Sequence, residues 1–269
     1  MITRGIETAA NGMMSLLDMN DSIAHNLANV NTAGYKKVSL TFRNIYDTRV
    51  EQATDPKDIK GTDHRYLGNL SMGSQTDRSI VAFTQGTLDR TGNPTDLAIS
   101  GDGFFKIQDS NGNVSYTRNG QFVIDSNQML TTMDGEKVLD VRNRPVQIDL
   151  KALNASQKDL VIRENGEIGI SNAELSMNLQ QLAIVDFTDK ENIRSIGTSK
   201  FVPSNPQTNP EVPATKYNIQ QGSIELSNSS TVNEMINTIN VSRNYETLSK
   251  LVKEDSDLLD TAINLGRIR

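Results

Sequence analysis

Residues 24–37, AHNLANVNTAGYKK, end a helical pattern that begins at the N-terminus. Gly34 stands where a helix C′ glycine belongs, because glycine takes positive φ without a Cβ clash. We therefore expect the first helix to end near Val30 to Ala33.

The apolar residues of this first helix recur by alternating steps of four and three, which is the spacing of a coiled-coil seam. The seam contains Ile2, Ile6, Ala9, Met13, Leu16, Asn20, Ile23, Leu27 and Val30. Its one polar member, Asn20, would weaken packing but help to fix the register. The other positions are mostly polar, so the helix is marginal alone and needs a partner.

A second helix is expected from about Thr231 to Gly266. Thr231 and Glu234 have the spacing of a capping box, and neither proline nor glycine interrupts the pattern. The apolar positions are Val232, Met235 and Ile239, and then Val241, Tyr245, Leu248, Val252, Asp255, Leu259 and Ala262. Their phase breaks near Ile239. A capped pattern this long indicates a coiled coil.

Between the helices the pattern changes to short runs rich in β-branched and aromatic residues, separated by Gly-Asp, Asn-Gly and Asp-Gly turns. The expected class is therefore α+β, with terminal helices that pair as a coiled coil and a central β-rich domain of hairpins. The expected boundaries are 1–35 plus 228–269 for the helical domain, 36–80 for an extended connector, and 81–227 for the β domain, with a Pro-rich loop at 202–216.

The two helices can bury their stripes in two ways. They can form an intramolecular hairpin packed on their own domain, or both can pack against copies of the same chain. We favour the second and expect these residues to form an assembly interface: Ile2, Ile6, Met13, Leu16, Asn20, Ile23, Leu27, Val30, Val232, Met235, Ile239, Tyr245, Leu248, Val252 and Leu259.

Composition excludes several kinds of function. The formal net charge is −6 and no basic block is present, which argues against nucleic-acid binding. Without cysteine the chain has no disulfide, thiol nucleophile or Cys-based zinc site. No apolar run is long enough to span a bilayer, and the N-terminal stretch lacks the apolar core of a cleavable signal.

Chemical motifs are also lacking. His25 and His64 lie in different regions, and the loop Asp109–Asn113 begins like a calcium site but has Val114 where such a loop needs glycine. GDG at 101–103 lacks the third glycine of a dinucleotide fingerprint. We expect no catalytic, cofactor-binding or metal-binding residue, and no enzymatic activity.

Three ordered motifs resemble bacterial flagellar rod and hook proteins. The first is Asn26-Leu27-Ala28-Asn29 followed by Thr32, Gly34, Tyr35 and Lys36. The second is LAISGDGFFKI (97–107), with Gly101, Gly103, Phe104 and Phe105, followed by YTRNGQF (116–122). The third, at 226–250, includes Arg243, Tyr245 and Glu246. His25, Ser229 and Ser242 depart from the residues that are usual in the family.

This resemblance implies a structural axial subunit of the flagellar basal body. Such subunits are exported unfolded through the flagellar type III apparatus and assemble in the periplasm into a hollow helical tube that transmits torque. The terminal helices line the inside of the tube and the β domain forms the outer layer. The implied partners are copies of the chain, neighbouring rod and hook proteins, the export apparatus and the surrounding bushing rings, with no nucleic acid and no membrane insertion.

The length of the segment from Lys37 to Val81 resembles distal rod proteins more than proximal ones. We therefore favour a distal rod subunit and keep a proximal rod subunit as an alternative. A soluble coiled-coil adaptor with a β recognition domain is an alternative of a different class.

Overall fold

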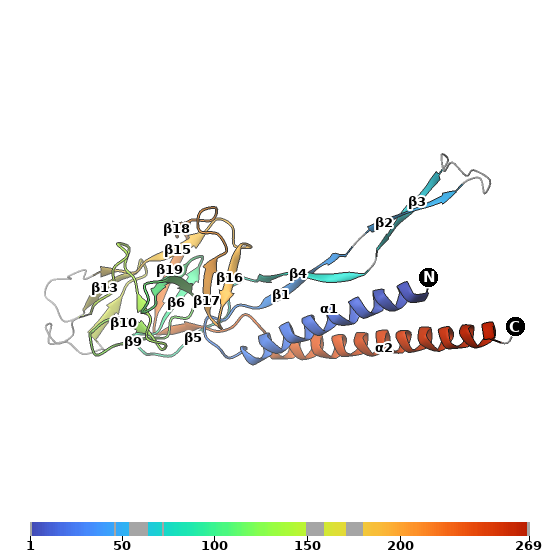
Figure 1. The fold of residues 1–269 in the computed structure, drawn as a ribbon. Coiled ribbons are helices and arrows are strands. Elements are labelled where there is room, and N and C mark those ends of the chain that lie inside the picture. Colours follow the sequence, from blue (N-terminus) through green and yellow to red (C-terminus); the bar gives the residue numbers. More distant parts are fainter. Residues whose placement is uncertain are drawn as a thin grey trace. The chain divides into compact units, whose positions relative to one another are not determined.

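The structure is a computed structural model, and it describes residues 2–45, 47–53, 64–71, 73–148, 159–170 and 180–267. One helix lies near each end, α1 (Ile2–Ala28) and α2 (Thr231–Arg267), and strands fill the chain between them (Figure 1). This order confirms the α+β class. The chain divides into two compact units: Met1–His25, Ser39–Ser79 and Val232–Arg269 form a helical unit, and Asn26–Val38 and Ile80–Thr231 form a β unit.

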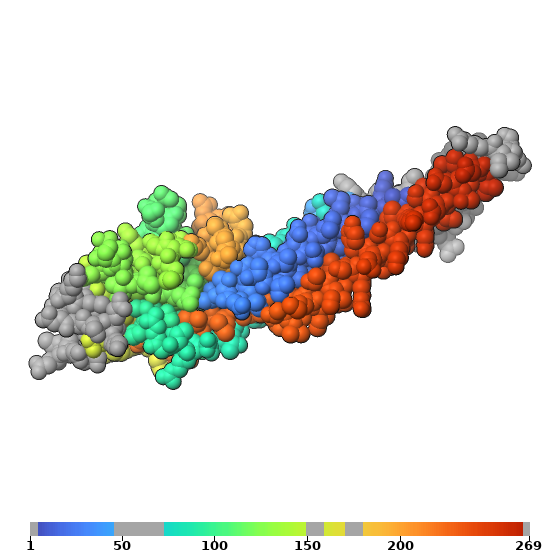
Figure 2. All heavy atoms as spheres, turned by 90° about the horizontal axis from the view of Figure 1, so that it is seen from below, coloured from blue at the N-terminus to red at the C-terminus, as the bar shows by residue number. Residues whose placement is uncertain are grey.

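The helical unit combines the two helices with two-stranded ribbons. Within this unit α1 and α2 run side by side (Figures 1 and 2). The segment expected to be an extended connector contains strands. They are β1 (Val38–Asn44), which pairs with β4 (Ser74–Val81), and β2 (Asp47–Ala53), which pairs with β3 (His64–Ser71).

The β unit is built around one nine-stranded sheet, with smaller sheets beside it. The sheet has the order β16-β17-β8-β7-β11-β10-β9, and β15 joins it through β7 and carries β18. Its strands are β7 (Phe104–Gln108), β8 (Val114–Thr117), β9 (Phe122–Ile124), β10 (Leu130–Thr132), β11 (Lys137–Val138), β15 (Ile184–Phe187), β16 (Ile193–Ile196), β17 (Lys200–Pro203) and β18 (Glu211–Pro213). The smaller sheets use β5 (Leu88–Arg90), β6 (Leu97–Gly101), β12 (Leu160–Ile162), β13 (Glu167–Ile170), β14 (Gln180–Gln181), β19 (Tyr217–Gln221) and β20 (Ser223–Glu225).

Strand β7 supplies both hydrophobic clusters of this unit. Successive side chains of a strand point to opposite faces, so Phe104 and Phe105 enter different clusters. Phe105 meets Phe122 edge-on, with ring centroids 5.1 Å apart, in the larger cluster. Phe104 meets Phe83 edge-on at 5.2 Å in the smaller one. Both phenylalanines of the central motif therefore hold the β unit together.

The Pro-rich segment 202–216 contains a short strand. Within it, β18 pairs with β15 and with no other described strand. An edge position tolerates Pro213, which has no N–H to donate to a ladder.

The first helix ends earlier than expected. Helix α1 stops at Ala28, and turns follow to Gly34. Gly34 does have positive φ, 69°, but its N–H donates to the Glu225 carbonyl at 2.7 Å rather than to a helix carbonyl. The expected role of Gly34 as the helix C′ residue is thus wrong. The glycine lets the chain turn against β20 instead.

Candidate assembly surface

The two helices contact each other in antiparallel fashion within the helical unit. A Cβ on Gly12 would lie 3.2 Å from Leu248 Cδ1, and one on Gly5 would lie 3.0 Å from Asp255 Oδ2. Gly5, which precedes Gly12 in α1, lies beside Asp255, which follows Leu248 in α2, so the helices run in opposite directions. Glycine at these places allows α1 to approach α2 closely.

The seam expected on α1 lies on its covered side. Ala9 and Ile23 are buried, and Ile6, Met13, Leu16, Asn20 and Leu27 are half-buried. Val30 is also half-buried, but it lies in the turn after the helix. The side chain of Ile2 falls outside the described residues. By contrast, Met14 and Leu17, which lie off the seam, are 65% and 51% exposed.

Helix α2 has two apolar faces rather than one continuous seam. Val241 is buried, and Leu248, Val252 and Leu259 are half-buried, while Tyr245 is 38% exposed. Val232, Met235 and Ile239 are 66%, 52% and 52% exposed. Two positions on a helix differ by about 200°, so Ile239 and Val241 point in nearly opposite directions. This geometry explains the phase break in the sequence. We name the exposed set Val232, Met235, Ile236 and Ile239 the outer stripe.

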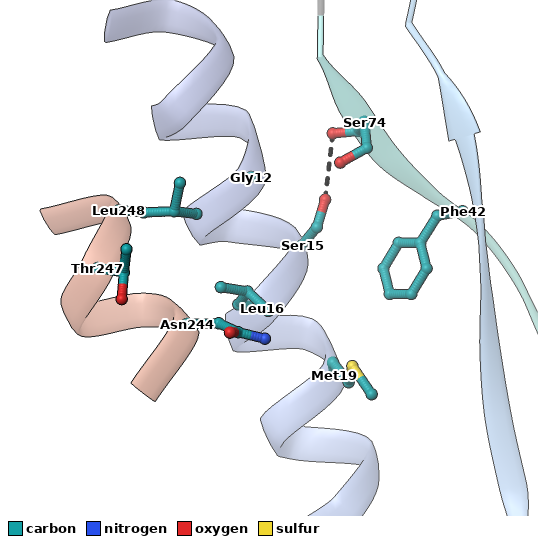
Figure 3. Close-up of a pocket in the computed structure, with 9 residues that line it drawn as sticks. All are labelled: Gly12, Ser15, Leu16, Met19, Phe42, Ser74, Asn244, Thr247 and Leu248. Atoms are coloured by element: carbon teal, nitrogen blue, oxygen red, sulfur yellow. Dashed lines mark hydrogen bonds between the residues drawn. The ribbon is translucent and has the colours of Figure 1, made fainter. Parts of the chain in front are cut away.

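A groove of about 430 Å³ lies over α1, between α2 and the β1–β4 ribbon (Figure 3). Gly12, Ser15, Leu16 and Met19 form its floor on α1. Phe42 and Ser74 come from the ribbon, and Asn244, Thr247 and Leu248 come from α2. The Ser15 hydroxyl donates to the Ser74 carbonyl at 3.1 Å, and the Thr76 hydroxyl donates to Asp18 at 2.6 Å. These bonds fix the ribbon beside α1.

The first family motif organises the segment after α1. The Asn26 side-chain amide donates to the Val38 carbonyl at 2.8 Å, while its oxygen accepts the Val38 N–H at 2.9 Å and the Tyr35 hydroxyl at 2.9 Å. One asparagine thus satisfies both backbone groups of Val38, as a neighbouring strand would. The Thr32 hydroxyl donates to Asn29 at 3.2 Å. These residues shape the chain inside the β unit.

The remaining motif residues divide between the β unit and the surface. Gly101 and Gly103 have φ of 104° and 121°, and a Cβ on either would approach neighbouring atoms within 3 Å. They permit the turn that separates β6 from β7. Arg243 and Glu246 are exposed on α2. At 3.6 residues per turn they continue the outer stripe toward the C-terminus.

A buried ion triad, formed by Lys36, Glu225 and Arg118, joins distant parts of the β unit. Glu225 accepts from Lys36 Nζ at 2.6 Å, from the Gly86 N–H at 2.8 Å and from Arg118 Nη1 at 3.2 Å. The Lys36 and Glu225 side chains are fully buried. Burial lowers the pKa of the Lys36 ammonium, and the Glu225 carboxylate offsets part of that shift.

Nothing in the local sequence identifies this triad as a unit, because its members are far apart in the chain. Lys36 and Arg118 lie in two different motifs of the sequence and Glu225 lies in neither, and lysine and arginine are ordinarily exposed residues. Invariance of the lysine, the arginine and the glutamate among related sequences could have identified the triad. A single sequence does not contain that signal.

Metal-binding clusters and membrane-spanning helices are not found in the described part of the chain. No group of three or more His, Cys, Asp or Glu residues there could hold a metal ion. None of the described helices combines the length and apolar character needed to cross a membrane.

Comparison with known proteins gives matches along the whole chain. Residues 98–170 match the "Flagellar hook protein FlgE/F/G D1 domain", and residues 220–265 match the "Flagellar basal body rod FlgEFG protein C-terminal" family. The chain is 33% identical to flagellar basal-body rod protein FlgG of Borreliella burgdorferi, over 98% of this chain and 99% of the relative. It is 28% identical to FlgG of Bacillus subtilis over 98% and 99%. It is 30% identical to rod protein FlgF of Caulobacter vibrioides over 95% of each chain.

Proposed function

The chain belongs to the family of bacterial flagellar basal-body rod proteins, and from this premise we propose that it is an axial subunit of the rod, the hollow helical tube that connects motor to hook. Proteins of this family are structural rather than enzymatic and lie in the flagellar basal body. The adaptor alternative loses its basis, because the family motifs run through both units of the chain.

The single observation that carries this function is the exposed apolar surface of the helical unit. The outer stripe of α2 and the pair Met14 and Leu17 of α1 are about half exposed or more. A helix face of this kind is stable in water only when another element covers it. Copies of the chain would provide that cover, and of the fifteen positions expected at the interface Val232, Met235 and Ile239 belong to this exposed surface. The antiparallel contact of α1 with α2 supports coiled-coil pairing as part of the same core.

We place the subunit in the distal rod. The relatives at 33% and 31% identity are named FlgG, other FlgG relatives are at 28%, and the FlgF relatives are at 29% and 30%. The length of the segment from Lys37 to Val81, which contains β1 to β4, also favours the distal rod. The proximal rod is the second candidate because the FlgF relatives cover 95% of the chain.

The proposed partners follow from this position. The subunit would contact copies of itself in the rod, together with neighbouring rod and hook proteins. It would reach the periplasm unfolded, through the flagellar type III export apparatus, and its β unit would face the bushing rings. The lack of cysteine suits this route, because an unfolded chain without thiols cannot be cross-linked on the way.

Deletion of the gene, followed by electron microscopy of isolated basal bodies, tests the proposal. We expect a rod that stops short and bears no hook, and we expect a plasmid copy of the gene to restore it. A long stub indicates the distal rod and a short stub the proximal rod. Complete basal bodies in swimming cells would contradict the function.

A further inference from the structure

We propose that the outer stripe of α2 seats in the groove over α1 of a second copy of the same chain. The inference rests on the proposed function and specifies which two surfaces of the subunit meet. The stripe is Val232, Met235, Ile236 and Ile239, and the floor of the groove is Gly12, Ser15, Leu16 and Met19.

The two surfaces have matching helical spacing. Both sets follow the pattern i, i+3, i+4 and i+7, which places four residues along one side of a helix. A stripe with this spacing is the ordinary form in which a helix enters a hydrophobic groove. Gly12 has no side chain, so Leu248 of α2 packs directly against this part of the floor, with the ribbon on the other side of the groove (Figure 3).

The four stripe residues and the groove lining are uncharged, and charge enters this face of α2 only beyond Ile239, at Arg243 and Glu246. The nine residues that line the groove are all uncharged, and four of them are large and apolar: Leu16, Met19, Phe42 and Leu248. The residues between the members of the stripe include Asn233 and Asn237, and the one acid there, Glu234, is buried on the other side of α2. Burying a charge without a partner costs several kcal/mol, so neutrality on both sides favours this pairing.

The competing apolar surface of α2 has different neighbours. Leu251 and Leu258 are also exposed, but Lys250, Lys253 and Asp257 lie beside them. Packing Leu258 into the neutral groove would strip water from those charges and offer them no opposite charge. The outer stripe is therefore the better occupant.

This contact is not self-complementary. The stripe and the groove are different surfaces of one chain, so each copy offers its stripe to one neighbour and its groove to another. A head-to-tail contact of this kind generates a ring or an open helical filament, whereas a self-complementary contact stops at a dimer. The pairing thus supplies the kind of repeat that a tube requires.

Cysteine cross-linking tests the pairing directly, because the chain has no cysteine of its own. A variant with Met19→Cys and Met235→Cys is expressed in the deletion strain, and isolated basal bodies are oxidised. Denaturing gels without reductant are expected to show a ladder of dimers, trimers and longer oligomers. Each single variant should remain monomeric. If the variant with Met19→Cys and Met235→Cys does not build rods, a variant with Leu16→Cys and Ile239→Cys repeats the test one helical turn further along the groove.

The matched control for cross-linking is Met19→Cys with Leu258→Cys. Leu258 is as exposed and apolar as the stripe, but it lies about 35 Å from Met235 along the helix, at 1.5 Å per residue. We expect no ladder from this pair. Complete rods that contain Met19→Cys and Met235→Cys but give only monomers would overturn the inference, and so would an equal ladder from the control.

An aspartate series gives a second readout. Met235→Asp and Ile239→Asp put a charge in the neutral groove and should give the truncated rods of the deletion strain, although an immunoblot shows exported chain. Asn240→Asp adds the same charge beside the stripe and should leave swimming intact. Complete rods with Met235→Asp would refute the pairing while the deletion phenotype still supports the rod function. A deletion strain with complete rods would instead refute the function itself.

Discussion

Replacing Glu225 with glutamine should destabilise the β unit more than any other single change to the buried ion triad. Glu225 is the one anion between two cations, Lys36 and Arg118, and its side chain is fully buried. The Glu225→Gln variant keeps the size of the side chain but removes the charge. Both cations would then remain buried without a counter-ion, although Lys36 keeps its bond to the Thr84 carbonyl at 2.8 Å.

The magnitude follows from this count of charges. Breaking a buried ion pair by removing one partner costs about 3–5 kcal/mol, and we expect Glu225→Gln to reach that range. Lys36→Met should cost less, because Glu225 would keep Arg118 and the Gly86 N–H as partners. Arg118→Met should also cost less than Glu225→Gln, because Lys36 and Glu225 would remain paired at 2.6 Å.

Urea unfolding of the full chain measures these differences, with near-ultraviolet circular dichroism of buried tyrosines such as Tyr116 reporting on the β unit. With a slope of about 2 kcal/mol per molar urea, Glu225→Gln should lower the midpoint by about 1.5–2.5 M. Glu164→Gln, at an exposed position of the same unit, is the matched control and should change little. A loss below about 1 kcal/mol for Glu225→Gln, or equal losses for Glu225→Gln and Lys36→Met, would refute the reasoning.

Three further predictions concern glycine, pH and concentration. Gly92→Ala should lower the free energy of unfolding by about 1–2 kcal/mol, because Gly92 has a left-handed backbone conformation. Gly34→Ala should lower it clearly more in the same urea assay, because the new Cβ would also lie 2.2 Å from the Asn119 nitrogen. Burial lowers the pKa of Lys36 in the folded chain, so between that pKa and 10.5 the unfolded chain binds more protons than the folded chain. The free energy of unfolding should therefore rise with pH across this window in the wild type. It should not do so in Lys36→Met. Circular dichroism of dilute monomer should show less helix than α1 and α2 contain in full, and an undiminished helical signal would contradict this dependence on partners.

Much of the fold could be predicted from sequence periodicity alone. The extent of α2 and the change from a helical to a strand period are local properties, and the structure confirms both. The end of α1 could not be placed in this way. A glycine with positive φ serves a helix end and a close backbone contact equally well, and at Gly34 the contact with β20 decides its conformation.

The division of α2 into two faces was visible in the sequence only as a break of phase. Spacing alone does not show which face is covered, because both parts of the pattern have heptad steps. Coverage depends on α1, whose Gly12 and Gly5 bring it against the face that holds Val241 and Leu248. The buried triad escaped prediction for a related reason, since Lys36 becomes a buried cation only when Glu225 folds against it.

The two faces let one helix serve both folding and assembly. From Val241 onward α2 uses one apolar side within the chain, with Val241, Leu248, Val252 and Leu259, whereas from Val232 to Ile239 its apolar side is exposed. A single face along the whole helix would be either covered by α1 throughout, leaving nothing for a neighbour, or exposed throughout, leaving α1 uncovered. The apolar face changes between Ile239 and Val241, which are two positions and about 200° of rotation apart. The exposed stripe therefore occupies only the first turns of α2. In this first part of α2 the exposed apolar surface is therefore a short patch, and the proposed pairing would cover it with a groove that is also uncharged.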